Sequence, residues 1–175
     1  MSKFYLILSI VIQFWLIEII NLMSGYELNK MGLLPRSISG LKGILLAPFL
    51  HSGIGHLILN TIPFSILGGL VLLKGTRPFF KVSIFIVILG GAGVWLFGRS
   101  AYHIGASGLI YGYFGYLVAK GWYEKSLSSI FIALAVLFLY SWMLWGVFPV
   151  SVFISWEGHL FGLIAGILSA KFLNN

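Results

Sequence analysis

Apolar residues run through this chain in long stretches, separated by short segments that contain charged residues, glycine or proline. A helix that crosses a membrane needs about 20 mainly apolar residues. By this measure the pattern predicts six transmembrane helices, of which the fourth and the sixth are short. Their expected ranges are roughly 4–23, 51–73, 79–97, 107–122, 127–147 and 156–173. The pattern therefore predicts an all-α membrane protein, a bundle of six transmembrane helices.

Two parts of the N-terminal region need a separate interpretation. The first apolar run is too long for a signal-peptide core and no small-residue cleavage site follows it, so we expect a retained helix. From Ser24 to Leu50 the chain is interrupted by Pro35, Pro48 and several glycines, yet its stretches MGLL and GILLAPFL are apolar. That combination predicts a segment that lies in the membrane interface and does not cross the bilayer.

The composition agrees with a membrane protein. Hydrophobic residues make up 59% of the 175 positions and charged residues only 9%, whereas a soluble domain has about 25% charged residues. No polar stretch is long enough for a linker or a second domain, so we expect one transmembrane domain over residues 1–175. The net charge of +7 comes from basic residues scattered between apolar runs, a pattern typical of membrane-protein loops and not of nucleic-acid binding.

The basic residues also predict an orientation. With the N-terminus inside, seven of them fall on the cytoplasmic side and four on the outer side, as the positive-inside rule requires. The cytoplasmic set is Lys3, Lys74, Arg77, Lys81, Lys120, Lys125 and Lys171, and the outer set is Lys30, Arg36, Lys42 and Arg99. We therefore expect both termini in the cytoplasm, and a minimal chain of this kind suggests a bacterial plasma membrane.

In this orientation the second, fourth and sixth helices all begin in the outer half of the bilayer. Polar residues within transmembrane helices are expensive and usually face one another or a water-filled cavity. The polar residues at these three helix starts are His51, His56, Asn60, Ser107 and His159. Their shared depth predicts a single polar site on the outer side.

Ser107 stands in the stretch HIGASGLIYGYFGYL and has two possible roles. At the start of a helix it lies beside unpaired backbone N–H groups, which suits a nucleophile that needs an oxyanion-binding backbone. Small residues such as Gly108, Gly112 and Gly115 equally suit close helix packing. The motif alone favours packing.

His159 changes that balance, because Gly162 and Gly166 share its helix face in HLFGLIAG. Two glycine stripes packed together would bring the fourth and sixth helices nearly into backbone contact, with His159 within reach of Ser107. A histidine that is hydrogen-bonded to a serine acts as a general base. The alternative is a histidine satisfied by a backbone carbonyl.

His56 and Asn60 lie four residues apart on one helix face, and His51 lies at the mouth of that helix. Amide and imidazole N–H groups suit an oxyanion hole. These residues would otherwise serve as interhelical hydrogen bonds that hold the bundle together. Three histidines could also supply zinc ligands, but the chain has no H-E-x-x-H motif, cysteine or aspartate, so we expect no metal and no cofactor.

Together these motifs resemble those of the rhomboid intramembrane serine proteases: H-x4-H-x3-N in the second helix, G-x-S-G at the start of the fourth and H-x2-G-x3-G in the sixth. The resemblance covers the six-helix core and implies a Ser107–His159 dyad. It further implies that His56, Asn60 and the Ser107 N–H are oxyanion donors and that Tyr111 stacks on His159. The supporting residues are His51, Tyr111, Gly105, Gly108, Gly162 and Gly166.

The family resemblance implies cleavage of transmembrane segments of other membrane proteins near the outer surface, usually after a small residue. The main alternative is a catalytically silent rhomboid-like protein that binds transmembrane helices. A small transporter or channel fits less well, because the polar residues form no relay to the inner side. Neither alternative involves nucleic acid.

One departure from the family pattern and two carboxylates need a separate interpretation. Lys42-Gly43 occupy the place where many rhomboids carry Trp-Arg, so the docking of the first loop is in question. Glu157 is two residues from His159 on a different face, and we expect it to be solvated at the interface; the alternative is a carboxylate partner for the histidine. For Glu18, near the outer end of the first helix, we expect snorkelling or a bond to the first loop, and the alternative is a role in gating.

Overall fold

The computed structural model describes residues 3–151 and 153–173, so the outermost two residues at each end of the expected domain lie outside it. The described part is helical and has no β-strand, only an isolated antiparallel bridge between Leu33 and His103. The long helices are α1 (Lys3–Met23), α5 (Thr76–Phe97), α6 (Ser107–Glu124), α7 (Leu127–Tyr140) and α8 (Trp156–Phe172). The prediction of an all-helical protein is confirmed.

The second expected helix is continuous but not uniform. It comprises α3 (Ile54–Pro63), a π-helical turn at Phe64–Gly68 and α4 (Gly69–Leu72). It begins at Ile54 and not at residue 51, because Gly53 has a φ of 127°, a conformation that an α-helix cannot contain. His51 is therefore in the preceding loop, which corrects its expected place in the helix.

The next helix, α5, begins three residues earlier than expected. Gly75, with a φ of 118°, precedes it and Pro78 lies in its first turn. Proline is accepted there because the first amide groups of a helix have no partner within it.

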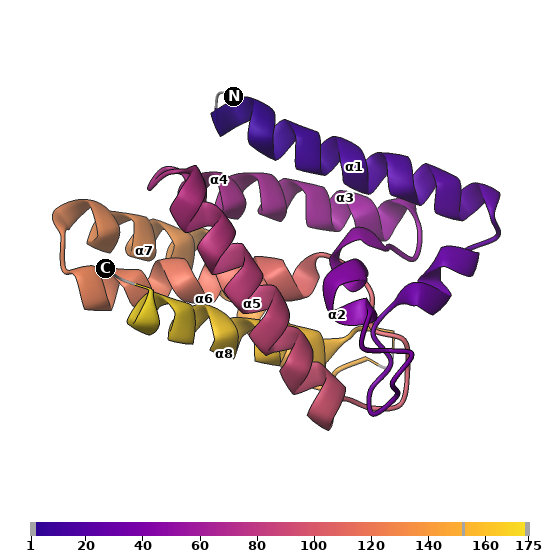
Figure 1. The fold of residues 1–175 in the computed structure, drawn as a ribbon. Coiled ribbons are helices and arrows are strands. Elements are labelled where there is room, and N and C mark those ends of the chain that lie inside the picture. The colour runs from indigo at the N-terminus through magenta and orange to yellow at the C-terminus, as the bar shows by residue number, and fades with distance from the viewer. Residues whose placement is uncertain (1–2, 152, 174–175) are drawn as a thin grey trace.

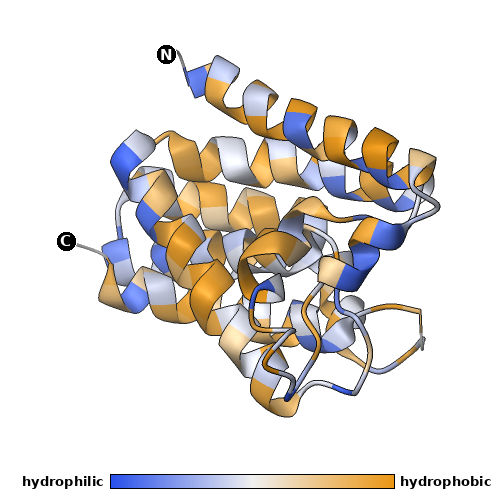
Figure 2. Cartoon of the chain, turned by 45° about the vertical axis from the view of Figure 1, so that its right-hand side comes forward, coloured by the Kyte–Doolittle hydropathy of each residue, from blue (hydrophilic) through white to orange (hydrophobic). Residues whose placement is uncertain are grey.

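Within residues 3–151 and 153–173, four helical segments are long and apolar enough to cross a membrane: Lys3–Met23, Ile54–Leu72, Thr76–Phe97 and Leu127–Val147. The last of these adds the 3-10 segment Ser141–Val147 to α7. Large apolar side chains cover their outer surfaces; Phe131 and Phe138 of α7, for example, are 73% and 85% exposed. Figure 2 shows hydrophobic residues along most of the helices and hydrophilic residues mainly near helix ends and in loops. The chain is an integral membrane protein.

The first loop (residues 24–53) contains only short helices: Glu27–Met31, α2 (Gly43–Leu46) and Ala47–Phe49. It is docked on the end of α5, where Arg36 donates to the carbonyls of Leu96 and Gly98. The indole of Trp95 in turn donates to the carbonyl of Ser37 at 2.9 Å. Lys42-Gly43 contribute differently, since the backbone of Gly43 lies against that of Leu33.

The α6 and α8 helices meet backbone to backbone. A Cβ atom on Gly162 would overlap the carbonyl of Gly108, and one on Gly166 would overlap the carbonyl of Gly112. The predicted contact between two glycine stripes is thus confirmed. Figures 1 and 2 also show that α1 begins and α8 ends at one end of the bundle, whereas the first loop lies at the other.

Candidate active site

A cavity of about 730 Å³ opens among the starts of α3, α6 and α8 and the end of the α7 segment. Its polar lining includes His56, Asn60, Ser107, Tyr111 and His159. Apolar and aromatic side chains complete the wall, among them Trp142, Met143, Trp145 and Phe153. Four of the five residues expected at the polar site thus share one cavity, together with Tyr111.

Ser107 is the first residue of α6, as the sequence predicts. The chain reaches it through Gly105, whose φ of 110° is the left-handed geometry that favours glycine. The amide of Gly105 donates to the carbonyl of Ala47 at 2.9 Å, which ties this turn to the first loop. Because Ser107 opens the helix, its own N–H has no partner within the helix and is free to face a ligand.

His159 has a defined tautomer. Its Nδ1 lies 2.8 Å from the carbonyl oxygen of Gly146, which can only accept, so Nδ1 carries a proton. In the neutral ring Nε2 is then the unprotonated nitrogen. Tyr111 lies parallel to the ring, with 4.0 Å between centroids and 6° between planes, as the family resemblance implies.

The described residues show no hydrogen bond between His159 and Ser107, although both line the cavity. In enzymes without substrate, catalytic hydrogen bonds are often long and shorten only in the complex. The absence of this bond is therefore compatible with a catalytic pair.

His56 has the opposite tautomer. Its Nδ1 lies 3.4 Å from the backbone N–H of Ser52, which can only donate, so the proton of the neutral ring is on Nε2. That atom faces the turn before Ser107: a Cβ atom on Gly105 would be 2.9 Å from His56 Nε2 and 3.8 Å from Ser107 Oγ. His56 Nε2 and Ser107 Oγ thus both lie beside Gly105. Asn60 Nδ2 donates to the His56 carbonyl at 2.7 Å and keeps a second N–H.

His51 does not line the cavity but lies behind His56 and is fully buried. Its ring centroid is 5.6 Å from that of Phe14 and 5.2 Å from that of His56. Burial, and then the neighbouring His56, lower the pKa of His51 from 6.5 to about 4. A neutral His51 therefore supports the ring of His56 from behind.

The two carboxylates, Glu157 and Glu18, are both buried. Glu157 is only 2% exposed and is paired with Arg99, so the expectation of interfacial solvation is wrong. Glu18 is fully buried, which excludes snorkelling. It accepts from Asn21 Nδ2 at 3.3 Å, and the same amide donates to the His51 carbonyl at 3.1 Å. Glu18 is therefore linked to the first loop through Asn21.

The sequence interpretation missed His103, which is 5% exposed and hydrogen-bonded to Ser155 at 2.6 Å. A signal was present, because Arg99 and His103 are two basic residues close before the G-x-S-G motif. Over residues 3–151 and 153–173 no three histidine, aspartate or glutamate side chains form a group that could hold a metal ion.

Comparison with known proteins gives a consistent result. A family model described as a rhomboid domain matches residues 39–175. Uncharacterized proteins of Mycobacterium tuberculosis and Mycobacterium bovis are each 40% identical to this chain, over 96% of its length and 74% of theirs. One from Mycobacterium leprae is 37% identical, over 96% of this chain and 70% of its own length. None of these three names states an activity.

Proposed function

The chain belongs to the rhomboid family, and on that premise we propose that it is an intramembrane serine endopeptidase with a Ser107–His159 dyad. The observation that carries this proposal is that His159 and Ser107 line one cavity. The carbonyl of Gly146 accepts from His159 Nδ1, which satisfies one ring nitrogen as in a structural histidine, and leaves Nε2 unprotonated as a base.

The proposed reaction is an acyl transfer. His159 Nε2 takes the proton of the Ser107 hydroxyl as Oγ attacks the carbonyl carbon of the scissile bond. The protonated His159 then donates that proton to the leaving amine, and the C–N bond breaks. Water, activated by the same histidine, hydrolyses the acyl-enzyme and restores the serine.

Three donors are proposed for the oxyanion of the tetrahedral intermediate. They are the backbone N–H of Ser107, the Nε2–H of His56 and the free N–H of Asn60. The tautomer of His56 supports this role, because it puts the proton on Nε2, the atom beside Gly105 in the turn before Ser107. Removing one such donor typically costs about 10²–10³ in rate.

We propose that the substrates are transmembrane segments of other membrane proteins. The cavity of about 730 Å³ is large enough for several residues of an unwound chain. Backbone in a helix is protected by its own hydrogen bonds, so segments that contain glycine or proline are the expected targets. No cofactor is part of the mechanism.

The proposed topology is a single domain with six membrane crossings, in which α6 and α8 join the four long apolar spans. The start of α1 and the end of α8 lie at the same end of the bundle, which supports an even number of crossings. With the positive-inside bias, both termini are then cytoplasmic. The mycobacterial relatives support a bacterial plasma membrane.

Co-expression with tagged single-span reporters tests the proposal. We expect cleavage by the wild-type protein and none by Ser107→Ala or His159→Ala. Cleavage that persists in either variant overturns the dyad. A fluorophosphonate probe is expected to label Ser107 covalently; a silent helix-binding protein would bind reporters without being labelled.

A further inference from the structure

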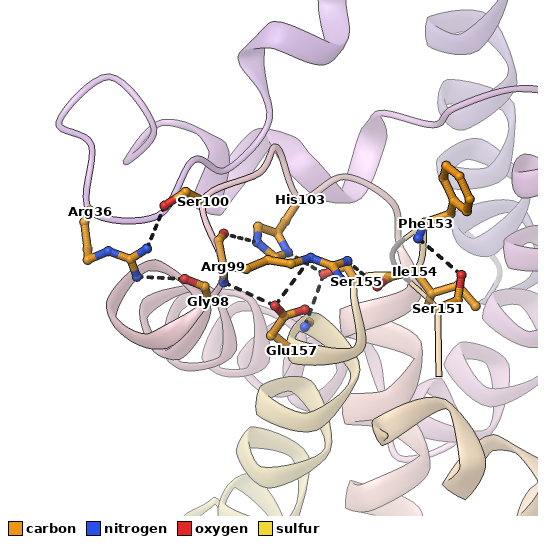
Figure 3. A network of polar contacts seen from close by, with 11 residues as sticks. Arg36, Gly98, Arg99, Ser100, His103, Ser151, Phe153, Ile154, Ser155 and Glu157 are labelled. Atoms are coloured by element: carbon orange, nitrogen blue, oxygen red, sulfur yellow. Dashed lines mark hydrogen bonds and ion pairs between the residues drawn. The ribbon is translucent and has the colours of Figure 1, made fainter. Parts of the chain in front are cut away.

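The loop before Ser107 and the segment before His159 are joined by a closed ring of polar contacts (Figure 3). The first is the serine loop (residues 98–106), which leads into α6, and the second ends at Ser155, which caps α8. Four residues form the ring: His103, Ser155 and Glu157 through their side chains, and Arg99 through its backbone N–H and carbonyl as well as its guanidinium. Between Ser155 and Glu157 the ring is closed by the backbone at the start of α8. None of the four residues belongs to the dyad or to the proposed oxyanion donors.

One half of the ring runs through His103. Its Nε2 lies 3.1 Å from the carbonyl of Arg99, which can only accept, so Nε2 carries the proton and Nδ1 accepts in the neutral ring. Burial lowers the pKa of His103, which favours this neutral form. The Ser155 hydroxyl donates to Nδ1 at 2.6 Å and accepts from the N–H of Gly158 at 3.3 Å. A single hydroxyl thus caps α8 and ties it to the serine loop.

The other half of the ring runs through Glu157. One carboxylate oxygen accepts from the backbone N–H of Arg99 at 3.2 Å and lies 3.6 Å from the guanidinium Nε. The same guanidinium donates to the carbonyl of Ile154. Glu157 is 2% exposed, and a buried charge without a partner is costly, so this pair has one strongly favoured arrangement.

We propose that Arg99, His103, Ser155 and Glu157 are positioning residues for the dyad. The inference rests on the proposed function. His103 is four residues before Ser107, and Glu157 is two residues before His159. The ring therefore fixes the two helix starts that carry the reacting groups, on the outer side of the glycine contact between α6 and α8. Arg99, His103 and Ser155 also line the cavity, so the ring forms part of its wall.

The ring fixes the relative position of the two helix starts, which helix packing alone does not do. The glycine contact between Gly108 and Gly162 keeps the helices close, but two touching helices can still slide or rotate by a fraction of an ångström. Misplacement of a reacting group by about 1 Å costs on the order of 10²-fold in rate. Hydrogen bonds with defined directions at both helix starts remove that freedom.

The test measures how fast a fluorophosphonate inactivates the full-length protein in detergent, because that reaction needs an aligned dyad but no substrate. For Glu157→Gln and Arg99→Gln we expect an inactivation rate about 10- to 100-fold below wild type. On a reporter substrate, kcat should fall by a similar factor with KM unchanged. Ser155→Ala should be slow, whereas Ser155→Thr, which keeps the capping hydroxyl, should recover most of the rate.

A matched control is Glu124→Gln, which removes an ion pair with Lys74 (2.6 Å) at the other end of α6. It should react at the wild-type rate. Thermal unfolding of each variant shows whether that variant folds. If Glu157→Gln does not fold, the test depends on Arg99→Gln, because the side chain of Arg99 is partly exposed. Wild-type rates in folded Glu157→Gln, or in folded Arg99→Gln, overturn the inference. Absence of labelling in the wild-type protein overturns the proposed function instead, and the inference with it.

Discussion

The ring of Tyr111 lies flat on the ring of His159, with 4.0 Å between their centroids and 6° between their planes. Tyr111 is one turn after Ser107 on α6, so the helix that carries the proposed nucleophile also supplies the surface against which the proposed base rests. Together with the carbonyl of Gly146, this contact holds the imidazole in one plane.

From this stacking we predict that the ring of Tyr111 matters more than its hydroxyl. Tyr111→Phe should keep most of the activity, whereas Tyr111→Ala should lower kcat by about 10- to 100-fold because His159 loses its planar support. Reporter cleavage under saturating substrate measures the effect. Tyr123→Ala, at an exposed position on the same helix, is the control. Equal activity of the alanine variant and wild type would contradict the prediction.

A second prediction concerns Gly146. A methyl group there would overlap the hydroxyl of Tyr111 and lie 3.1 Å from His159 Nδ1. Gly146→Ala should therefore lower kcat by about tenfold or more, through displacement of the histidine. Because the hydroxyl of Tyr111 is the nearest obstacle, Gly146→Ala combined with Tyr111→Phe should recover part of the activity. A double variant as slow as Gly146→Ala alone would show that the clash lies elsewhere.

Substitution of Gly166 should affect stability. In Gly166→Ala the new methyl group meets the carbonyl of Gly112 and forces α6 and α8 apart. We expect the free energy of unfolding to fall by about 1–3 kcal/mol, as for other overpacked sites. Gly69→Ala is the matched control, since nothing lies within 4 Å of its Cβ position and alanine favours helix. Thermal unfolding in detergent compares the two, and a similar midpoint for both would refute the argument.

The buried His51 predicts a dependence of stability on pH. Its pKa is lowered from 6.5 to about 4, so below pH 6.5 the unfolded chain takes up a proton that the folded protein does not. Stability due to this group is therefore complete above pH 6.5 and decreases as the pH falls, by up to about 3 kcal/mol near and below pH 4. His51→Phe, whose ring would pack on Phe14, should lose less stability over that range. Parallel unfolding curves for the two proteins would exclude His51 as a source.

The helices were predictable because the bilayer imposes a simple requirement. Four of the six expected spans are found in the described residues, and the expected and observed ranges of the helices α1 and α6 differ by two residues at most. The starts of the second and third helices were less predictable. They are determined by the positive φ of Gly53 and Gly75, and a hydropathy pattern carries no information on that angle.

The polar residues, too, were predictable only in part. Shared depth was enough to bring His56, Asn60, Ser107 and His159 to one cavity, because helix rise and orientation follow from sequence. The partners of Glu18, Glu157 and His103 were not predictable. Glu18 is bonded to Asn21 of its own helix, and Asn21 in turn reaches the first loop. The partners of Glu157 and His103 come from segments whose path depends on tertiary contacts, such as the bridge between Leu33 and His103. Burial of a carboxylate can be inferred only once its partner is known.

The backbone contact between α6 and α8 has a mechanical consequence. Where glycines meet carbonyls, no side chain lies between the helices, so no rotamer change can alter their spacing. A bilayer that thins or thickens tilts helices to match their hydrophobic length. Here both helices would have to tilt as one body. The separation between Ser107 and His159 therefore does not change with the thickness of the membrane. The other helices around the cavity can still tilt when the thickness changes.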